Sequence, residues 1–562
     1  MPRLIATLAV LAALLAPATA TATEPPPGAT WQEAYLTSTD GTRLHADILR
    51  PEHLPATART PVVLSVSPYT NHGGDTTPDP RKSGPSHRFY DFLELTQAIQ
   101  RGYTYVMVDL RGTGGSAGCQ DWGGPGEQAD VEAAVEWAAG QPWSNGRVGL
   151  LGKSYDGWTG LMGIANQPKG LAAVVSMEPV YSGYRYLYSD GVRYSNSVIT
   201  PLLFDGISGM PGSPEDTPEY HVNGALGNVE RPGCPLLSFL DQQEDRQNAL
   251  FWQSRDLITK IRKLQPRTPL FMTQGFLEVN TKPDGAFDVF AAMRGPKRAW
   301  FGQFDHVRGW EDTGRAPKPF VAELNRFLDR HLKGETPSKV DGPMVVQQFD
   351  GRWRDEEAWP PTDSKRYATS LRPGTYADDS SNSGTSGPGE GVWTISRPLA
   401  DPMQLAGEPL VTARVTTSVP RANLVANVYD IDETGHAIMI SRNAALLRDA
   451  GEQTANLKLY GQDWVVQRGH RIGVLLSGSN TDWWVHVPTF SDVTVDEARV
   501  ELPFLPKPRR TFIEGGSDDR RSARLEEEQE GGFDVPDETI EEADTPFVKP
   551  AVRSAKRSRR AR

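Results

Sequence analysis

A single serine stands between two glycines at the end of an apolar run, in the stretch GRVGLLGKSYDGWTG. The hydroxyl of Ser154 could serve as a nucleophile, but an alkyl hydroxyl needs a neighbouring base, a carboxylate that orients the base, and donors for the developing oxyanion. The generic nucleophile turn is Gly-x-Ser-x-Gly. Here Gly157 comes one position late and Asp156 takes its place. The motif by itself fits either a plain turn or a sharp strand-to-helix bend that presents Ser154.

Three of the ten histidines lie between Ser154 and Gly342, and each is a candidate base: His221, His306 and His331. His306 directly follows the strand-like run KRAWFGQF, and catalytic loops of parallel sheets gather at the carboxyl ends of strands. His221 falls in an irregular segment. His331 falls on an amphipathic helix, where a boundary or solvated histidine is ordinary. We therefore predict His306 as the base, with a plain surface position as the alternative.

The orienting carboxylate is expected after the strand-like run TPLFMTQG, because such sheets present serine, then acid, then histidine along the chain. Glu278 lies closest to the end of that run, and Asp284 is the reserve. Asp288 falls on the following helix. The acid must hold the imidazole in one tautomer and offset its charge. We predict the triad Ser154, Glu278 and His306.

Elements that could position these residues alternate between strand-like and helix-like patterns. Near-continuous apolar runs such as TPVVLSVSPY and GYTYVMVDLRG are typical of buried parallel strands. The stretch GEQADVEAAVEWAAGQPW has the apolar spacing of a helix. Strand–helix–strand order predicts a parallel sheet with helices on both faces.

The chain is too long for one compact core, so we expect several domains. The fold class is α/β, and the C-terminal part has many short strands, which predicts a β-sandwich of the jelly-roll kind. The predicted division is 1–22 signal peptide, 23–165 and 267–336 α/β domain, 166–266 cap insertion, 337–506 jelly-roll domain, and 507–562 disordered charged tail.

Several of these motifs resemble the X-Pro dipeptidyl-peptidase and cocaine-esterase-like serine hydrolases. In that family the nucleophile turn is Gly-x-Ser-Tyr-x-Gly, which matches GKSYDG and makes the late glycine expected. GYTYVMVDLRGTGGSAG is similar to the family's Asp-x-Arg-Gly segment, and FDHVRGW is similar to the segment with its catalytic histidine. The family usually has aspartate at the position of Glu278, where this chain departs from the pattern.

The resemblance implies an α/β-hydrolase fold and an oxyanion hole. SVSPYTN is similar to the family segment whose tyrosine hydroxyl stabilises the oxyanion, which implies that role for Tyr69, together with the backbone N–H of Tyr155. It implies a peptide or ester as substrate. We favour an X-Pro dipeptidyl-peptidase, with an acyl esterase or amino-acid ester hydrolase as the alternative.

A dipeptidyl-peptidase must bind a free ammonium group, which calls for a carboxylate beside the cleft. The candidates are Asp156, Glu178, Asp190 and Asp205, each of which is also compatible with a structural role. A hypothesis of another class is a non-catalytic carbohydrate- or surface-binding protein with Trp483 and Trp484 as an aromatic platform. Core positions are the ordinary alternative for those two residues.

Composition and the N-terminus limit the partners. The net charge of −12 argues against nucleic acid, which requires a concentrated basic face. Residues 1–22 read as a secretory signal, with an apolar run too short to span a bilayer, so we expect an exported protein without stable membrane association; an uncleaved anchor is the alternative.

Cys119 and Cys234 could form a disulfide. No cofactor and no metal site is predicted, because no His, Cys and carboxylate cluster has metal-ligand spacing.

Overall fold

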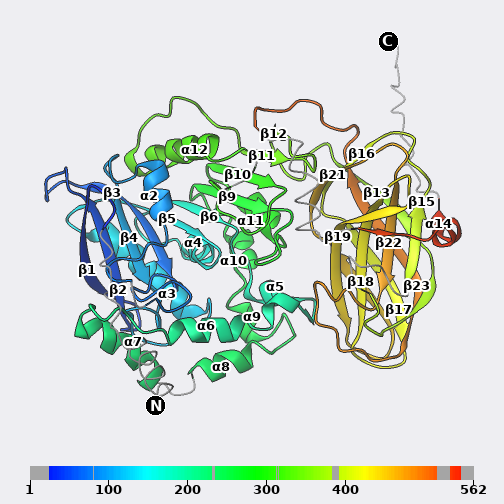
Figure 1. Ribbon diagram of the computed structural model, residues 1–562, viewed down its shortest axis with the longest axis horizontal. Coiled ribbons are helices and arrows are strands. Elements are labelled where there is room, and N and C mark those ends of the chain that lie inside the picture. The colour runs from blue at the N-terminus through cyan, green and yellow to red at the C-terminus, as the bar shows by residue number, and fades with distance from the viewer. Residues whose placement is uncertain are drawn as a thin grey trace, which may run out of the picture.

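The computed structural model has two parts that lie side by side, a sheet covered by helices and a β-sandwich (Figure 1). It describes residues 25–545 except for 80–81, 231–233, 312, 314, 383–390 and 516–531. The predicted signal peptide, 1–22, lies outside the described residues. Within the described ranges, no helix combines the length and apolarity needed to cross a membrane.

A ten-stranded sheet forms the core of the first part, in the order β1-β2-β4-β3-β5-β6-β9-β10-β11-β12. Each neighbouring pair from β4 to β11 is parallel, whereas β1–β2, β2–β4 and β11–β12 are antiparallel. Every residue of β3 and β4 is buried, because helices cover both faces of the sheet. The strands are β1 (Ala29–Thr37), β2 (Arg43–Pro51), β3 (Thr60–Ser67), β4 (Thr104–Asp109), β5 (Ser144–Lys153), β6 (Leu171–Met177), β9 (Leu270–Gly275), β10 (Lys297–Gly302), β11 (Met344–Gln347) and β12 (Trp353–Glu356).

Two apolar clusters on opposite faces hold the helices to this sheet. One face carries α3 (Pro125–Gly140), α4 (Tyr155–Asn166), α10 (Leu257–Leu264) and α11 (Ala286–Ala292). The other face carries α2 (Tyr90–Thr96), α12 (Lys318–Leu328) and the short η2 (Asp329–Lys333). This arrangement confirms the α/β-hydrolase fold that the sequence implied.

The boundaries of the predicted domains need two corrections. The cap predicted at 166–266 contains a strand of the sheet, since β6 pairs in parallel with both β5 and β9. The α/β domain does not end at 336, because β11 pairs in parallel with β10 and β12 follows it. Both errors have one cause: the local pattern of a short strand is the same whichever sheet the strand joins.

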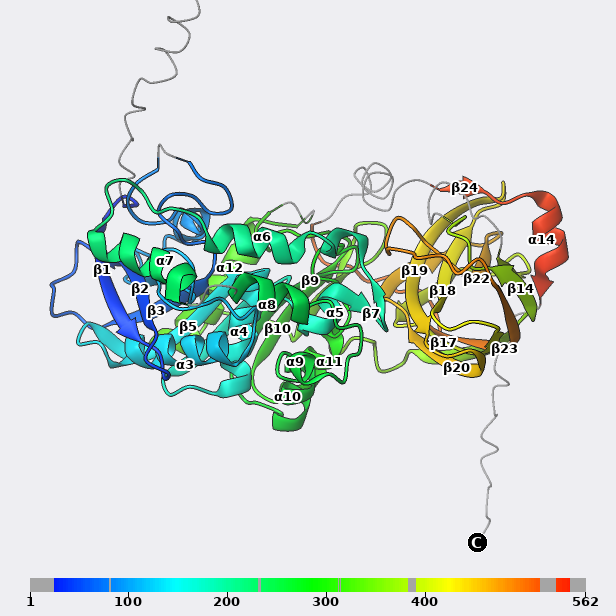
Figure 2. The same ribbon diagram turned by 90° about the horizontal axis from the view of Figure 1, so that it is seen from below.

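The cap inserted after β6 is mostly helical, and Figure 2 shows α6, α7 and α8 along one side of the sheet. Its elements are α5 (Gly183–Leu187), β7 (Tyr188–Ser189), β8 (Val192–Arg193), η1 (Ser195–Ser197), α6 (Thr200–Ser208), α7 (Pro218–Glu230), α8 (Cys234–Asp241) and α9 (Leu250–Gln253). Cys119, in the loop after β4, is disulfide-bonded, and Cys234 is the only other cysteine of the chain.

The C-terminal β-sandwich confirms the predicted architecture. One sheet has the order β20-β17-β23-β16-β21, with β13 and β14 also paired to β23, and the other has the order β24-β19-β18-β22-β15-β25. The strands are β13 (Lys365–Leu371), β14 (Gly374–Ala377), β15 (Val392–Ser396), β16 (Met403–Gly407), β17 (Leu410–Thr417), β18 (Ala422–Ile431), β19 (His436–Leu447), β20 (Gly451–Lys458), β21 (Gln462–Val466), β22 (Arg471–Ser477), β23 (Asp492–Phe504), β24 (Phe533–Asp534) and β25 (Asp544–Thr545).

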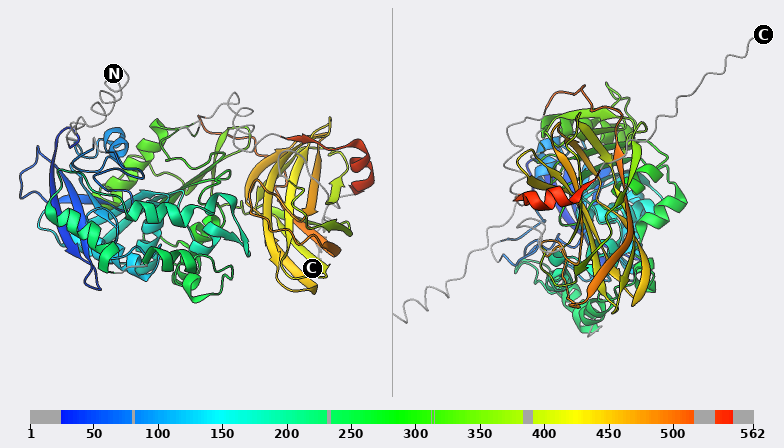
Figure 3. Two further views of the ribbon diagram at one scale, coloured as in Figure 1. Left: turned by 60° about the horizontal axis from the view of Figure 1, so that its bottom comes forward. Right: turned by 90° about the vertical axis from the view of Figure 1, so that its right-hand side faces the viewer.

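Part of the tail predicted as disordered, 507–562, is ordered on this sandwich. The helix α14 (Asp537–Ala543) lies at the outer end of the sandwich (Figure 3). In the chain it stands between β24, which pairs with β19, and β25, which pairs with β15 of the same sheet. Phe533, Val535 and Ala543 are buried in the cluster beneath it. A few well-spaced apolar residues therefore anchor a segment whose overall composition is charged.

The same cluster decides the position of the two tryptophans. Trp483 and Trp484 are 8% and 1% exposed and pack with Tyr194 of the cap. They belong to the contact between cap and sandwich, so the proposed aromatic platform for a binding protein is wrong.

Candidate active site

Ser154 occupies a strained bend between β5 and α4. Its backbone φ angle is 65°, a value that residues other than glycine rarely adopt. Its N–H donates to the carbonyl of Met177 on β6 (2.9 Å). A Cβ on Gly152 would lie 2.3 Å from the Asp156 backbone, and one on Gly157 would lie 2.9 Å from the Met177 carbonyl oxygen. The two glycines are required by close approach, which supports the sharp bend over the plain turn.

Asp156, which stands where the generic motif has glycine, is paired with Arg88. Asp156 is buried and accepts from Nε of Arg88 at 2.7 Å. The Arg88 guanidinium lies 4.2 Å from the centroid of the Tyr69 ring. The Tyr69 hydroxyl is in turn a hydrogen-bonding neighbour of the Ser154 side chain, and burial raises the pKa of Tyr69 so that the hydroxyl keeps its proton. Asp156 thus helps to position the ring that faces the serine.

His306 and Glu278 form a hydrogen-bonded pair. Nδ1 of His306 lies 2.7 Å from Oε2 of Glu278, whose side chain is fully buried. The other carboxylate oxygen accepts from the backbone N–H groups of Asn280 (2.6 Å) and Thr281 (3.0 Å). Burial alone would raise the pKa of Glu278, but the charge and hydrogen bond of His306 outweigh it and lower that pKa. Glu278 is therefore ionised and holds the proton of His306 on Nδ1.

A second buried carboxyl group supports Glu278 from behind. Glu178 accepts hydrogen bonds from Thr273, from Gln274 and from the N–H of Gly275. Burial and the neighbouring charge of Glu278 raise its pKa well above the usual value, and the protonated group hydrogen-bonds to Glu278. Glu178 thus adds a donor to Glu278, a role that nothing in the sequence pattern indicated.

The other candidates lie elsewhere. Asp284 is paired with Arg185 at 2.6 Å rather than with His306. His221 is on the cap helix α7, and His331 is on η2, where its carbonyl accepts from Arg147 at the beginning of β5. His331 therefore lies near the amino-terminal end of β5, whereas Ser154 follows the carboxyl-terminal end of that strand.

Ser154, Glu278 and His306 follow β5, β9 and β10, so all three lie at the carboxyl edge of parallel strands. In the part of the chain that the structure describes, no hydrogen bond joins the Ser154 hydroxyl to His306. Catalytic hydrogen bonds are often loose in free enzymes and tighten when substrate binds. The backbone N–H of Tyr155 is the first of α4 and has no acceptor within the helix, so it is free to face an oxyanion.

Two protein-family models match this chain, each over a different part of it. Residues 40–308 match the family model described as X-Pro dipeptidyl-peptidase (S15 family), and 339–522 match the one described as X-Pro dipeptidyl-peptidase C-terminal non-catalytic domain. The two matches correspond to the sheet-and-helix part and to most of the β-sandwich.

The individual relatives are named either as dipeptidyl-peptidases or as esterases. A Streptomyces avermitilis protein named "Putative Xaa-Pro dipeptidyl-peptidase" is 26% identical over 69% of this chain, which spans 61% of that relative's length. The cocaine esterase of a Rhodococcus species is 25% identical over 78% of this chain and 89% of its own. A solved CocE/NonD family hydrolase from Staphylococcus aureus has the same fold, with a TM-score of 0.65, 16% identity, and coverage of 85% of this chain and 94% of its own.

Proposed function

Because the chain belongs to the X-Pro dipeptidyl-peptidase family of serine hydrolases, we propose that it releases Xaa-Pro dipeptides from peptide N-termini through an acyl-enzyme. Ser154 attacks the carbonyl carbon of the proline residue, and His306 takes the serine proton. His306 then gives that proton to the leaving amine, and water hydrolyses the acyl-enzyme by the same route. The observation that carries the proposal is the buried Glu278–His306 pair at the same sheet edge as the strained Ser154. From the predicted signal at 1–22, the proposal places the enzyme outside the cell.

Tyr69 supplies the side-chain donor of the oxyanion hole in this scheme, beside the N–H of Tyr155. Replacing Tyr69 with phenylalanine removes only the hydroxyl, so kcat is expected to fall about 10²- to 10³-fold with little change in the midpoint of thermal unfolding. Tyr376→Phe is the matched control, because it removes another buried hydroxyl, bonded to the Asn423 carbonyl at 2.7 Å in the sandwich. Equal losses in both variants would contradict a catalytic role for Tyr69.

Among the carboxylates considered for the substrate ammonium, Asp205 fits best. Asp156 is paired with Arg88, Glu178 is engaged behind Glu278, and Asp190 lies in the turn that contacts the sandwich. Within the described residues Asp205 has no ion-pair partner, and partial burial raises its pKa to about 6. Its neighbour Phe204 packs on the ring of Tyr155 with centroids 4.9 Å apart.

A substrate panel tests this assignment. Ala-Pro-anilide with a free amine is expected to be cleaved at least about 10-fold more efficiently than its N-acetylated form, since a charge-assisted hydrogen bond contributes about 1.5–3 kcal/mol. Asp205→Asn should remove that preference and leave hydrolysis of a p-nitrophenyl ester unchanged. The exposed Asp241→Asn is the matched control.

The same preference should depend on pH. Since the pKa of Asp205 is about 6, its carboxylate is charged above that pH and loses its charge below it. The ratio of free-amine to blocked-amine kcat/KM should therefore fall as the pH is lowered from about 7.5 to about 5. Cleavage of both anilides at equal rates would favour the esterase alternative, which the name of the cocaine esterase relative supports.

A further inference from the structure

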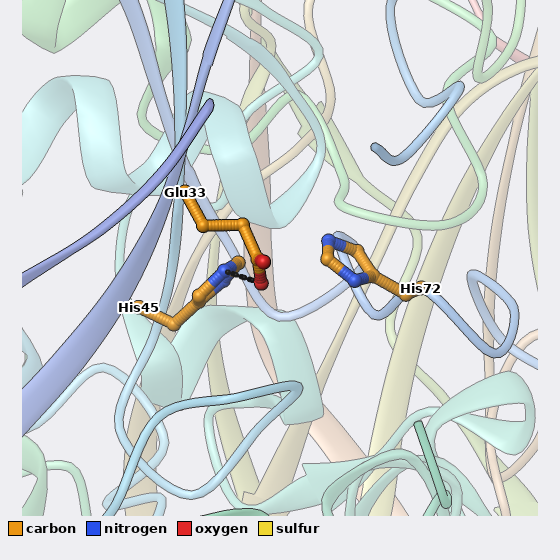
Figure 4. Close-up of side chains that lie close together, drawn as sticks. All are labelled: Glu33, His45 and His72. Atoms are coloured by element: carbon orange, nitrogen blue, oxygen red, sulfur yellow. Dashed lines mark hydrogen bonds and ion pairs between the residues drawn. The ribbon is translucent and has the colours of Figure 1, made fainter. Parts of the chain in front are cut away.

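A cluster of two imidazoles and two carboxylates, of which all but one carboxylate are buried, lies on the first strands of the sheet and the loop after β3, outside the predicted triad. Glu33 is on β1 and pairs in register with Asp47 on β2. His45 is two residues before Asp47, so all three side chains lie on one face of the ribbon. His72 reaches them from the loop after β3, and Figure 4 shows the Glu33 carboxylate between the two rings.

The nitrogens that face the centre of this cluster each meet a carboxylate. Nε2 of His45 lies 3.2 Å from Glu33, and Nε2 of His72 lies 3.0 Å from Asp47. The ligand atoms of Glu33, His45 and His72 all lie within 4.8 Å of one another. A tetrahedral zinc site with bonds of 2.0–2.1 Å places its ligand atoms about 3.3 Å apart. A small contraction would therefore bring these three ligand atoms onto one ion, and Asp47, 3.0 Å from Nε2 of His72, is the adjacent carboxylate that completes a set of four.

The outward nitrogens meet carboxylates as well. Nδ1 of His45 lies 3.0 Å from Asp109, and Nδ1 of His72 lies 2.7 Å from Asp216. Asp109 is itself held by the hydroxyl of Thr70 and by a backbone N–H. Metal-binding histidines usually donate their second N–H to a carboxylate in this way, which fixes the ring and leaves Nε2 for the metal.

Each ring of the cluster meets a carboxylate at both of its nitrogens, one facing the centre and one facing outward. This is the arrangement of a metal-binding histidine that has a ligand carboxylate on one side and an orienting carboxylate on the other. Without a metal, a doubly protonated imidazole would donate to both carboxylates, and the metal content of the purified protein distinguishes these two states. One oxygen of Asp47 faces His72, because Trp31 donates to the other oxygen at 2.7 Å.

We propose that Glu33, His45, Asp47 and His72 bind a zinc ion or a similar divalent metal. Imidazole and carboxylate ligands together suit zinc better than calcium or magnesium, which prefer oxygen alone. The site connects three segments: the β1–β2 ribbon, the loop after β3, and the cap, whose Tyr220 stacks on His72 with centroids 4.6 Å apart. Its role is structural, and it anchors the loop after β3, which carries Tyr69 three residues before His72.

Metal content and metal-dependent stability test the site in the full chain. The purified protein is expected to contain one zinc per chain by mass spectrometry of the metal. After chelation, added Zn²⁺ should bind with 1:1 stoichiometry in calorimetry and raise the midpoint of thermal unfolding. Co²⁺ in place of Zn²⁺ should show the visible absorption of a four-coordinate site.

Two variants locate the ion. Glu33 is 25% exposed and tolerates replacement, so Glu33→Gln should fold and bind Zn²⁺ at least about 100-fold more weakly. Asp216→Asn, which alters only an outer carboxylate, should weaken binding about 10- to 100-fold. Glu52→Gln, an exposed position just after β2, should change nothing. The proposal is overturned if the chelated wild-type chain neither binds nor is stabilised by Zn²⁺, or if Glu33→Gln binds it as tightly as the wild type.

Discussion

Replacing Ser154 with alanine is expected to lower kcat by at least about 10⁴-fold, because no other group in the scheme forms the acyl-enzyme. The free energy of unfolding should change little. Alanine keeps the Cβ that already exists at the strained φ of 65°, and the backbone bond to Met177 is unaffected. Hydrolysis of the anilide and of the ester, each at saturating substrate, gives kcat, and circular dichroism on heating gives the stability.

Labelling by a fluorophosphonate makes this prediction independent of the substrate. The wild-type chain should be labelled at Ser154 and the Ser154→Ala variant should not. Ser441→Ala is the matched control, since it removes a buried hydroxyl that donates to a backbone carbonyl at 2.6 Å in the sandwich. Full activity or full labelling of Ser154→Ala would end the serine-hydrolase scheme for this site.

Glu278→Gln is expected to lower kcat by about 10⁴-fold, because an amide in place of the carboxylate no longer holds the His306 proton on Nδ1 or offsets the imidazolium charge. Glutamine has nearly the same volume, so packing around this buried position is retained. Glu278→Asp keeps the charge with a shorter side chain, and partial activity in that variant would separate the role of the charge from that of folding. The measurement is kcat across pH for both variants.

Asp284→Asn is the matched comparison for Glu278→Gln. Asp284 lies in the same loop after β9 but is bound to Arg185 at a partly exposed position. Its loss should cost at most about 1 kcal/mol of stability and leave kcat within a few-fold of the wild type. A large loss in Asp284→Asn with an active Glu278→Gln would reverse the assignment of the acid.

Several features of the site were accessible from the sequence because they depend on local chemistry. The apolar runs that became β3, β4 and β5 identified a parallel sheet, and the order of Ser154, an acid and His306 along the chain restricted the search to strand ends. The resemblance to a known family added Tyr69, whose hydroxyl the structure places beside Ser154. None of these inferences required the path of the chain between the strands.

Other features depended on which strands become neighbours. Leu171–Met177 was predicted as part of the cap, and β11 and β12 as part of the sandwich, since a short apolar strand does not specify its partners. The choice between Glu278 and Asp284 likewise needed the loop after β9, which turns one carboxylate toward His306 and the other toward the cap.

By itself, the sequence determined the fold class, the two main domains and a short set of reactive residues, because hydrophobic period and turn chemistry act over a few residues. The tertiary structure alone decided the partner of His306, the hydrogen bond of Glu178 to Glu278, and the meeting of Glu33, His45 and His72, with Asp47 bonded to His72. Those contacts join side chains from different strands and loops. Their distances follow from sheet order and strand register, which no local pattern of residues encodes.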